Sequence, residues 1–328
     1  MIKKLLVYRS SCVDPYFNIA TEKLLLESVQ PDCCILYLWQ NQNTVVIGRN
    51  QNAWAECRTS LLEEEGGKLA RRLSGGGAVF HDVGNLNFTF LMCDEDYDVD
   101  RQLSVIQTAC AKLGLQAEKS GRNDLLVEGQ KFSGNAFYHC QGHAYHHGTL
   151  LIGVDMEKLS RYLTPSKAKL EAKGVASVRS RVTNLKALVP ELTCELMSEY
   201  MEKSFAQVYG HQPKQITLTD DQRKTVEVYA AELSSWEWLY GPRLPFSFCC
   251  EDRFSWGSIS LQLHIESGCI QTVQVYSDAM DWEIADIISK SLTGCRFACK
   301  DMQQAISYAL GNTDVSRDLC RLLAQQDI

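Results

Sequence analysis

The stretch Arg71-Arg72-Leu73-Ser74-Gly75-Gly76-Gly77-Ala78-Val79-Phe80-His81-Asp82 carries the strongest chemical signal in the chain. Three consecutive glycines let a backbone approach a ligand closely and turn its N–H groups toward an anion. Two arginines directly before them can donate to phosphate or carboxylate oxygens. The apolar run Ala78-Val79-Phe80 follows at once. A tight β-turn alone would also explain the glycines, but the flanking residues favour a site for an anionic, partly apolar ligand.

This stretch differs from the two common nucleotide-binding loops. No Gly-Lys-Ser/Thr follows the glycines, so the stretch is not a Walker A loop, and its glycine spacing is not that of a dinucleotide fingerprint. The chemistry of the ligand therefore has to come from other parts of the chain.

A second polar cluster follows about fifty residues later. Asn123 and Asp124 can hold hydroxyl groups or a metal ion that bridges phosphates. Lys131 lies beside the turn formed by Ser133 and Gly134, and its ammonium group is a compact charge suited to a developing phosphoryl charge. An exposed hairpin lysine is the competing interpretation.

Two further motifs complete the set. His146 and His147 are adjacent on a predicted strand, so they point to opposite faces and cannot easily share one metal ion. At least one of them is expected to be a structural histidine. The basic, glycine-containing segment 173–181 is expected to close over a nucleotide, or else to be a solvated charged loop.

Composition limits the possible partners and compartments. The 328 residues carry a net charge of -7 without a Lys/Arg block, which argues against nucleic acid or an anionic membrane as partner. No apolar stretch is long enough to span a bilayer, and the start of the chain lacks the pattern of an export signal. The 14 cysteines form no metal-binding pairs and are expected to be buried free thiols in a reducing cytoplasm.

Helical and strand patterns interleave without a regular βαβ repeat, which indicates an α+β fold. Asp14-Pro15 predicts the start of a helix with Glu22 on its polar face, and 87–91 alternates like a half-buried strand. A turn-rich break after Trp238 precedes a hairpin over 258–275 and several short helices. The predicted domains are a catalytic domain over 1–244 and a small α+β domain over 245–328.

Taken together, the motifs resemble the lipoate–protein ligase A family, of the bacterial type with a C-terminal accessory domain. The resemblance runs through the motifs above and adds segments near both ends of the chain. In chain order the matching segments are 14–18, 44–49, 71–82, 121–124, 131–134, 147–151, 177–185, 235–238 and 253–257.

The resemblance implies a catalytic fold shared with biotin ligases and the class II aminoacyl-tRNA synthetase core. It also implies a two-step reaction that uses ATP and magnesium. Lipoate attacks the α-phosphate of ATP to give lipoyl-AMP, and a lysine of an apo lipoyl domain then takes the acyl group. The implied acceptors are the E2 subunits of 2-oxoacid dehydrogenases and the glycine-cleavage H protein.

Carried over by position, the resemblance implies that Lys131 is the catalytic lysine and that Asp124 is a magnesium ligand. The residues implied to bind substrate or ATP are Arg71, Arg72, Ser74, Gly75, Gly76, Gly77, Ala78, Val79, Phe80, His81, Asn123, Asp124, Ser133, Gly134, His147, Thr149, Lys173 and Arg179.

Two alternatives stay open at this point. The first is a nucleotide-independent lipoyl or octanoyl acyltransferase, for which Cys140 near the Lys131 turn could carry a thioester. The second is a non-catalytic module that binds lipoate or lipoyl-AMP. The chain's order of preference between lipoate and octanoate is not legible from the sequence.

Overall fold

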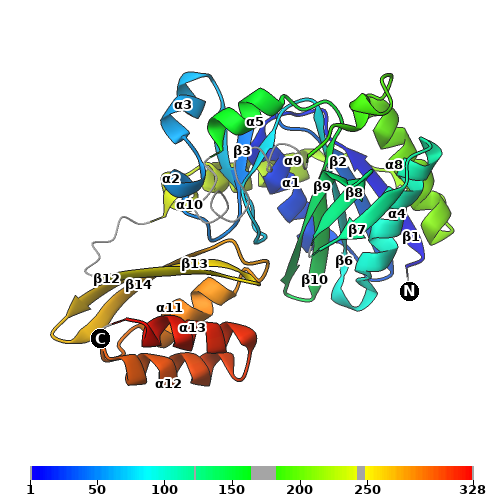
Figure 1. Ribbon diagram of the computed structural model, residues 1–328. Helices are drawn as coiled ribbons and strands as arrows, with labels where there is room; N and C mark the ends of the chain where they lie inside the picture. Colours follow the sequence, from blue (N-terminus) through cyan, green and yellow to red (C-terminus); the bar gives the residue numbers. More distant parts are fainter. Residues whose placement is uncertain (1, 122, 164–181, 242–247, 327–328) are drawn as a thin grey trace.

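The computed structural model describes residues 2–121, 123–163, 182–241 and 248–326. Its centre is an eight-stranded mixed sheet with the strand order β11-β1-β2-β6-β10-β9-β8-β7 (Figure 1). The strands are β1 (Lys4–Arg9), β2 (Cys33–Trp39), β6 (Asn85–Cys93), β7 (Ala117–Ser120), β8 (Asp124–Val127), β9 (Gln130–Cys140), β10 (His143–Leu151) and β11 (Lys214–Gln215).

Helices cover both faces of this sheet. Helices α4 (Val99–Lys112) and α8 (Cys194–Tyr209) pack on one face, and α1 (Pro15–Ser28) and α9 (Asp220–Leu233) pack on the other. Strand β6 lies in the middle and is buried along its whole length. The prediction of a half-buried strand over 87–91 is therefore wrong: Phe88 and Phe90 face one helical layer and Leu91 faces the other.

Helix α1 begins as its sequence predicts. The Asp14 carboxylate accepts from the backbone N–H groups of Tyr16 and Phe17, and Pro15 occupies the first turn. The prediction that Glu22 lies on an exposed polar face is wrong, because its side chain is 0% exposed. Helix α9 covers one side of α1 while the sheet covers the other, so this helix has little exposed surface.

A smaller sheet with the order β4-β3-β5 lies beside the main one and carries the glycine-rich turn between β4 and β5. Its apolar side is covered by three short helices. These elements are β3 (Thr44–Ile47), β4 (Lys68–Arg71), β5 (Val79–His81), α2 (Ala53–Glu56), α3 (Thr59–Glu64) and α5 (Met156–Tyr162). The remaining short elements before residue 242 are η1 (Asp94–Asp96), η2 (Leu185–Ala187) and α10 (Trp236–Tyr240).

The C-terminal residues form a separate small domain with its own core (Figure 1). The predicted hairpin is confirmed, with its turn at Ser267 and Gly268, both at positive φ. The domain contains β12 (Phe248–Phe254), β13 (Gly257–Glu266), β14 (Cys269–Ser277), α11 (Ile284–Leu292), α12 (Cys299–Leu310) and α13 (Asp314–Ala324). The predicted boundary at 244/245 falls outside the described residues and stays a prediction.

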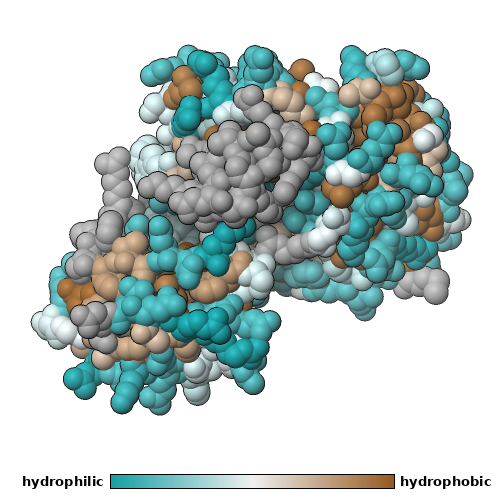
Figure 2. Space-filling model, viewed as in Figure 1, coloured by the Kyte–Doolittle hydropathy of each residue, from teal (hydrophilic) through white to brown (hydrophobic). Residues whose placement is uncertain are grey.

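The surface mixes polar and apolar side chains, and the cysteines are free thiols. On the face shown in Figure 2, apolar residues gather in small groups between hydrophilic ones over both domains. None of the described helices has the length and apolar character needed to cross a bilayer. All 14 cysteines are free, and several are buried as predicted, but Cys249 is exposed.

Candidate active site

A cavity of about 320 Å³ opens between the two sheets of the large domain. It brings together most of the predicted residues from the glycine-rich turn and from β8, β9 and β10. Those that line it are Arg72, Gly76, Gly77, Ala78, Val79, His81, Asn123, Asp124, Lys131, Gly134, His147 and Thr149. Arg71, Ser74, Gly75, Phe80 and Ser133 do not line it, and Lys173 and Arg179 lie outside the described residues.

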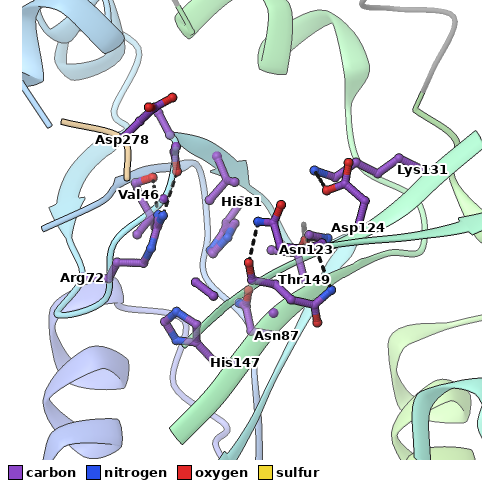
Figure 3. Close-up of a pocket in the computed structure, with 18 of the residues that line it drawn as sticks. Val46, Arg72, His81, Asn87, Asn123, Asp124, Lys131, His147, Thr149 and Asp278 are labelled. Carbon is purple, nitrogen blue, oxygen red and sulfur yellow. Dashed lines mark hydrogen bonds and ion pairs between the residues drawn. The ribbon is translucent and has the colours of Figure 1, made fainter. Parts of the chain in front are cut away.

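Lys131 and Asp124 form an ion pair in the wall of the cavity, with 2.6 Å between Nζ and Oδ1 (Figure 3). About a third of each side chain is exposed, 34% for Lys131 and 36% for Asp124, so the pair marks the solvent-accessible mouth. Gly134 leaves room for the lysine: a Cβ at that position would lie 3.1 Å from Nζ. The spacing of Lys131 and Gly134 on β9 thus places an ammonium group where an anionic ligand would enter.

Asn123 joins the start of β8 to β9 beside this mouth. Its Nδ2 donates to the carbonyl of Asn135, and the Asn135 N–H donates to the Asn123 carbonyl. Val182, where the described chain resumes, pairs with Lys131, and the Thr183 N–H donates to the Lys131 carbonyl. The chain therefore joins the sheet directly at Lys131, just after the segment predicted to close over a nucleotide.

Arg72 holds the glycine-rich turn in shape. Its guanidinium donates to Ser74 Oγ and to the carbonyls of Gly75 and Gly77. Burial lowers the pKa of Arg72 to about 10, although this side chain has no carboxylate partner among the described residues. Because the turn holds the Arg72 guanidinium beside the cavity, Arg72 adds positive potential to the site in addition to shaping the turn.

Arg71 points away from the cavity. Its guanidinium donates to five backbone carbonyls, those of Gly48, Arg49, Gln51, Trp238 and Leu239. Burial, followed by the nearby Arg49 charge, lowers the pKa of Arg71 to about 10. The donors predicted to bind phosphate or carboxylate are thus used to tie β3 and α10 to β4.

The two adjacent histidines of β10 face opposite ways, as predicted. His146 lies in the core, where its ring contacts Gln102 Oε1 at 3.0 Å and Asn135 Oδ1 at 2.8 Å. His147 lines the cavity. His146 therefore supports Asn135 at the mouth from behind, and His147 belongs to the site itself.

Glu22 lies behind the cavity wall, in contact with His147, and the sequence did not predict this position. Its Oε1 accepts from Thr89 Oγ1 at 2.7 Å and contacts His147 Nδ1 at 2.8 Å. His147 Nε2 in turn contacts Ser74 Oγ at 2.8 Å, and Ser74 accepts from Arg72. A buried chain thus links α1, β10 and the glycine-rich turn. On an amphipathic helix, a glutamate at position 22 looks like an ordinary polar-face residue, so the sequence gives no signal for this buried role.

The C-terminal domain reaches the same cavity. Arg253 and Asp278 line its rim, and the Gly76 N–H donates to the Ala279 carbonyl at 3.0 Å. A Cβ on Gly75 would lie 2.3 Å from that carbonyl oxygen, so this glycine permits the close approach. Arg253 and Asp278 were not predicted as site residues, because only the fold brings them to a turn some two hundred residues earlier.

Cys140 lies in a different cavity, together with Tyr138, Leu73 and Arg49. It does not line the cavity that contains Lys131. The geometry therefore gives no support to a thioester on this cysteine next to the lysine.

Comparison with known proteins agrees with this two-domain arrangement. The family model of the lipoyl protein ligase A/B catalytic domain matches residues 14–206, and that of the bacterial lipoate protein ligase C-terminus matches residues 244–319. A lipoate-protein ligase A from Psychrobacter cryohalolentis is 39% identical over 308 residues, which cover 92% of this chain and 91% of the relative.

Two solved structures extend the likeness to the fold. Plasmodium falciparum LipL1 in complex with lipoate is 27% identical, with a TM-score of 0.85 over 98% of this chain and 100% of that one. The bipartite lipoate protein ligase of Thermoplasma acidophilum, described with its E2 lipoyl domain, is 26% identical, with a TM-score of 0.66 over 75% of this chain and 99% of that one.

Fold, cavity and matches together define a ligase with an α+β catalytic domain and a small C-terminal domain. More particularly, the chain belongs to the lipoate–protein ligase A family. Lipoate ligation is accordingly its activity.

Proposed function

We propose that this chain lipoylates proteins in two ATP-dependent steps within the cavity that contains Lys131. In the first step, a lipoate carboxylate oxygen attacks the α-phosphorus of ATP, and the bond from that phosphorus to pyrophosphate breaks. In the second step, a lysine ε-amine of the acceptor attacks the acyl carbon, loses a proton and releases AMP. The observation that carries the proposal is the ammonium group of Lys131, the one lysine among the described residues that line the cavity, at the mouth of a cavity with both polar and apolar walls.

The lysine fits both steps by its place and charge. Negative charge develops on the phosphoryl oxygens in the first step and on the acyl oxygen in the second. A fixed cation aimed at those positions in a partly desolvated site lowers both barriers. Asp124 holds the Lys131 ammonium in place through the 2.6 Å ion pair, so its position is set before substrate arrives.

The glycine-rich turn and the interior suit the two ends of the substrate. Gly76 and Gly77 line the cavity near its rim, while Ile19, Trp39 and Val46 line it with apolar surface. An acyl chain can therefore lie inside with its carboxylate at Lys131. This arrangement presents the reacting carbon to the mouth, where nucleotide and acceptor lysine both arrive.

Magnesium fits this mouth as an ion shared with phosphates. Magnesium in nucleotide sites is held by one or two carboxylates, with phosphates and waters as the other ligands. Asp124 supplies one carboxylate, and no group of three or more His, Cys, Asp or Glu side chains gathers as a metal cage in the described part of the chain. When bound, the ion would offset charge between the phosphates.

The acceptors that fit are lipoyl domains of 2-oxoacid dehydrogenase E2 subunits and the glycine-cleavage H protein. The Thermoplasma ligase of similar fold is described with an E2 lipoyl domain, which supports the first of these. An extended acceptor lysine would reach the acyl carbon from the rim, because the mouth is the exposed end of the cavity.

Replacing the lysine tests the proposal. Lys131→Met keeps a long, unbranched side chain but removes the charge. We expect lipoate-dependent pyrophosphate release to fall at least about 100-fold, the usual loss for one electrostatic contact to a transition state. Lys119→Met serves as the matched control, because Lys119 lies on the edge strand β7 and forms a surface ion pair with Asp100 of α4. Equal activity of the two variants, with both folded by circular dichroism, would remove Lys131 from the chemistry.

A further inference from the structure

Two buried polar side chains line the cavity with an N–H group that has no hydrogen-bond partner within the described chain. They are His81, whose free atom is Nε2, and Asn87, whose free atom is Nδ2. His81 is 3% exposed and Asn87 is 1% exposed. Leaving a buried donor unpaired is costly, so two such donors in one cavity point to an acceptor on the ligand.

The hydrogen-bond network fixes which His81 nitrogen carries the proton. Asn18 Nδ2 donates to Asn41 Oδ1 at 3.0 Å, which leaves the Asn41 NH₂ group to face His81 Nδ1 at 3.2 Å. His81 Nδ1 therefore accepts, and Nε2 carries the hydrogen in the neutral ring. Burial, with the Arg72 charge nearby, lowers the pKa of His81 to about 3, so the ring stays neutral at ordinary pH.

Asn87 is oriented in a similar way. Asn85 Nδ2 donates to Asn87 Oδ1 at 2.9 Å, so the Asn87 amide accepts on its oxygen side and its NH₂ group is the side left without a partner. Asn87 lies opposite Trp39 on the paired strand, and Trp39 also contacts the His81 ring edge to face. The two donors thus belong to one aromatic-walled region of the cavity.

This region lies away from the mouth. Lys131 and Asp124 are about one-third exposed, whereas His81 and Asn87 are almost fully buried. Figure 3 shows His81 and Asn87 between the Arg72 and His147 side of the cavity and Thr149, with the Lys131–Asp124 pair beyond. If the carboxylate lies at Lys131, then the distal part of the acyl chain is what meets these donors.

We propose that His81 Nε2–H and Asn87 Nδ2–H form a donor pair that selects acyl chains carrying a hydrogen-bond acceptor in their distal part, such as the dithiolane sulfurs of lipoate, over all-carbon chains such as octanoate. The proposal rests on the proposed function, because it assumes that the carboxylate lies at the mouth. Sulfur is a weak acceptor, but an all-carbon chain would bury both donors without any partner. Selection therefore works chiefly by penalising the wrong chain.

The test compares lipoate with 5-cyclopentylpentanoate, which has the same chain and ring size without sulfur. We expect kcat/KM for pyrophosphate release to favour lipoate by at least about 10-fold, the effect of one to two unpaired donors. His81→Phe and Asn87→Leu should each shrink that preference several-fold by improving use of the carbocycle. Thermal unfolding shows whether each variant is folded. One folded variant is enough for the test.

Two results would overturn the donor pair: equal use of both acids by the unchanged chain, or equal losses for both acids in both folded variants. Failure of the proposed function gives a different pattern, since neither acid would then release pyrophosphate. In that case calorimetric binding of the two acids without ATP still decides the matter. Tighter binding of lipoate that His81→Phe abolishes supports the pair, and equal affinity refutes it.

Discussion

At the scale of single residues, the buried glutamate of α1 explains how the cavity wall is held together. Glu22 accepts from Thr89 and contacts His147, whose other nitrogen contacts Ser74. Since all of these groups are buried, each depends on the next for its hydrogen bonds. This series of hydrogen bonds runs from Glu22 to Arg72, so the shape of the glycine-rich turn depends on a side chain some fifty residues earlier.

Glu22→Leu should destabilise the protein by about 2–4 kcal/mol, because it leaves two buried partners without their acceptor. Urea unfolding measures this loss directly. Glu27→Gln on the same helix is the matched control: Glu27 is exposed and accepts a hydrogen bond from Tyr229 OH, so its replacement should cost less than about 1 kcal/mol. Similar unfolding midpoints for both variants would show that the buried chain contributes no stability.

At the scale of elements, strand β10 shows what periodicity can and cannot predict. Alternation along a strand correctly places His146 and His147 on opposite faces. The partners of each face come from α4 and α1, which lie far away in the chain, so no local pattern names them. For the same reason the polar look of Glu22 on α1 misleads: helical periodicity describes one buried face, whereas this helix is covered by α9 as well as by the sheet.

Other elements also separate into features that local sequence predicts and features that depend on tertiary contacts. The start of α1 at Pro15 and the hairpin of β13 and β14 follow from local cap and turn chemistry, and both are predictable. Most residues of the motifs gather in the cavity because they lie on the neighbouring strands β8, β9 and β10 or in the turn between β4 and β5. Arg71 does not, since its carbonyl partners come from two segments that only the tertiary fold brings together.

The buried histidine of β10 also predicts a pH dependence. Burial lowers the pKa of His146 to about 3, so between about 6.5 and 3 the unfolded chain binds a proton that the folded chain does not. The stability contribution of the neutral ring is complete above pH 6.5 and is lost as pH falls through that window, at up to about 1.4 kcal/mol per pH unit. His81 acts in the same direction.

Urea unfolding between pH 7.5 and 4.5 checks this. The free energy of unfolding should fall toward acid in the unchanged chain and fall less steeply in His146→Gln, which cannot titrate. A slope that the substitution leaves unaltered would mean that His146 binds its proton equally in the folded and unfolded chains, so that burial does not lower its pKa.

At the scale of the whole molecule, the two domains meet at the cavity that contains Lys131. The Gly76 N–H donates to the Ala279 carbonyl, and Asn50 joins both the Trp282 carbonyl and the Ser277 N–H. The glycine-rich turn is therefore shared between the cavity and the domain interface, so its conformation is sensitive to both.

Gly75→Ala should open this interface, because the added Cβ would lie 2.3 Å from the Ala279 carbonyl oxygen. Gly77→Ala is the matched control, since a Cβ there meets nothing within 4 Å. Hydrogen exchange of peptides over 73–80 and 277–283 should rise about 10-fold or more in the first variant and stay near the unchanged chain in the second. Equal exchange in both would show that the contact is not closed in solution.

Taken as a whole, we propose, this molecule activates lipoate with ATP and passes the lipoyl group to a protein lysine. Intact-mass spectrometry of an apo lipoyl domain incubated with the chain, lipoate and magnesium, with and without ATP, tests it most directly. We expect a lipoyl-sized mass gain only when ATP is present, and none with Lys131→Met. A gain without ATP, or no gain even with ATP and an acceptor that a known ligase modifies, would contradict it.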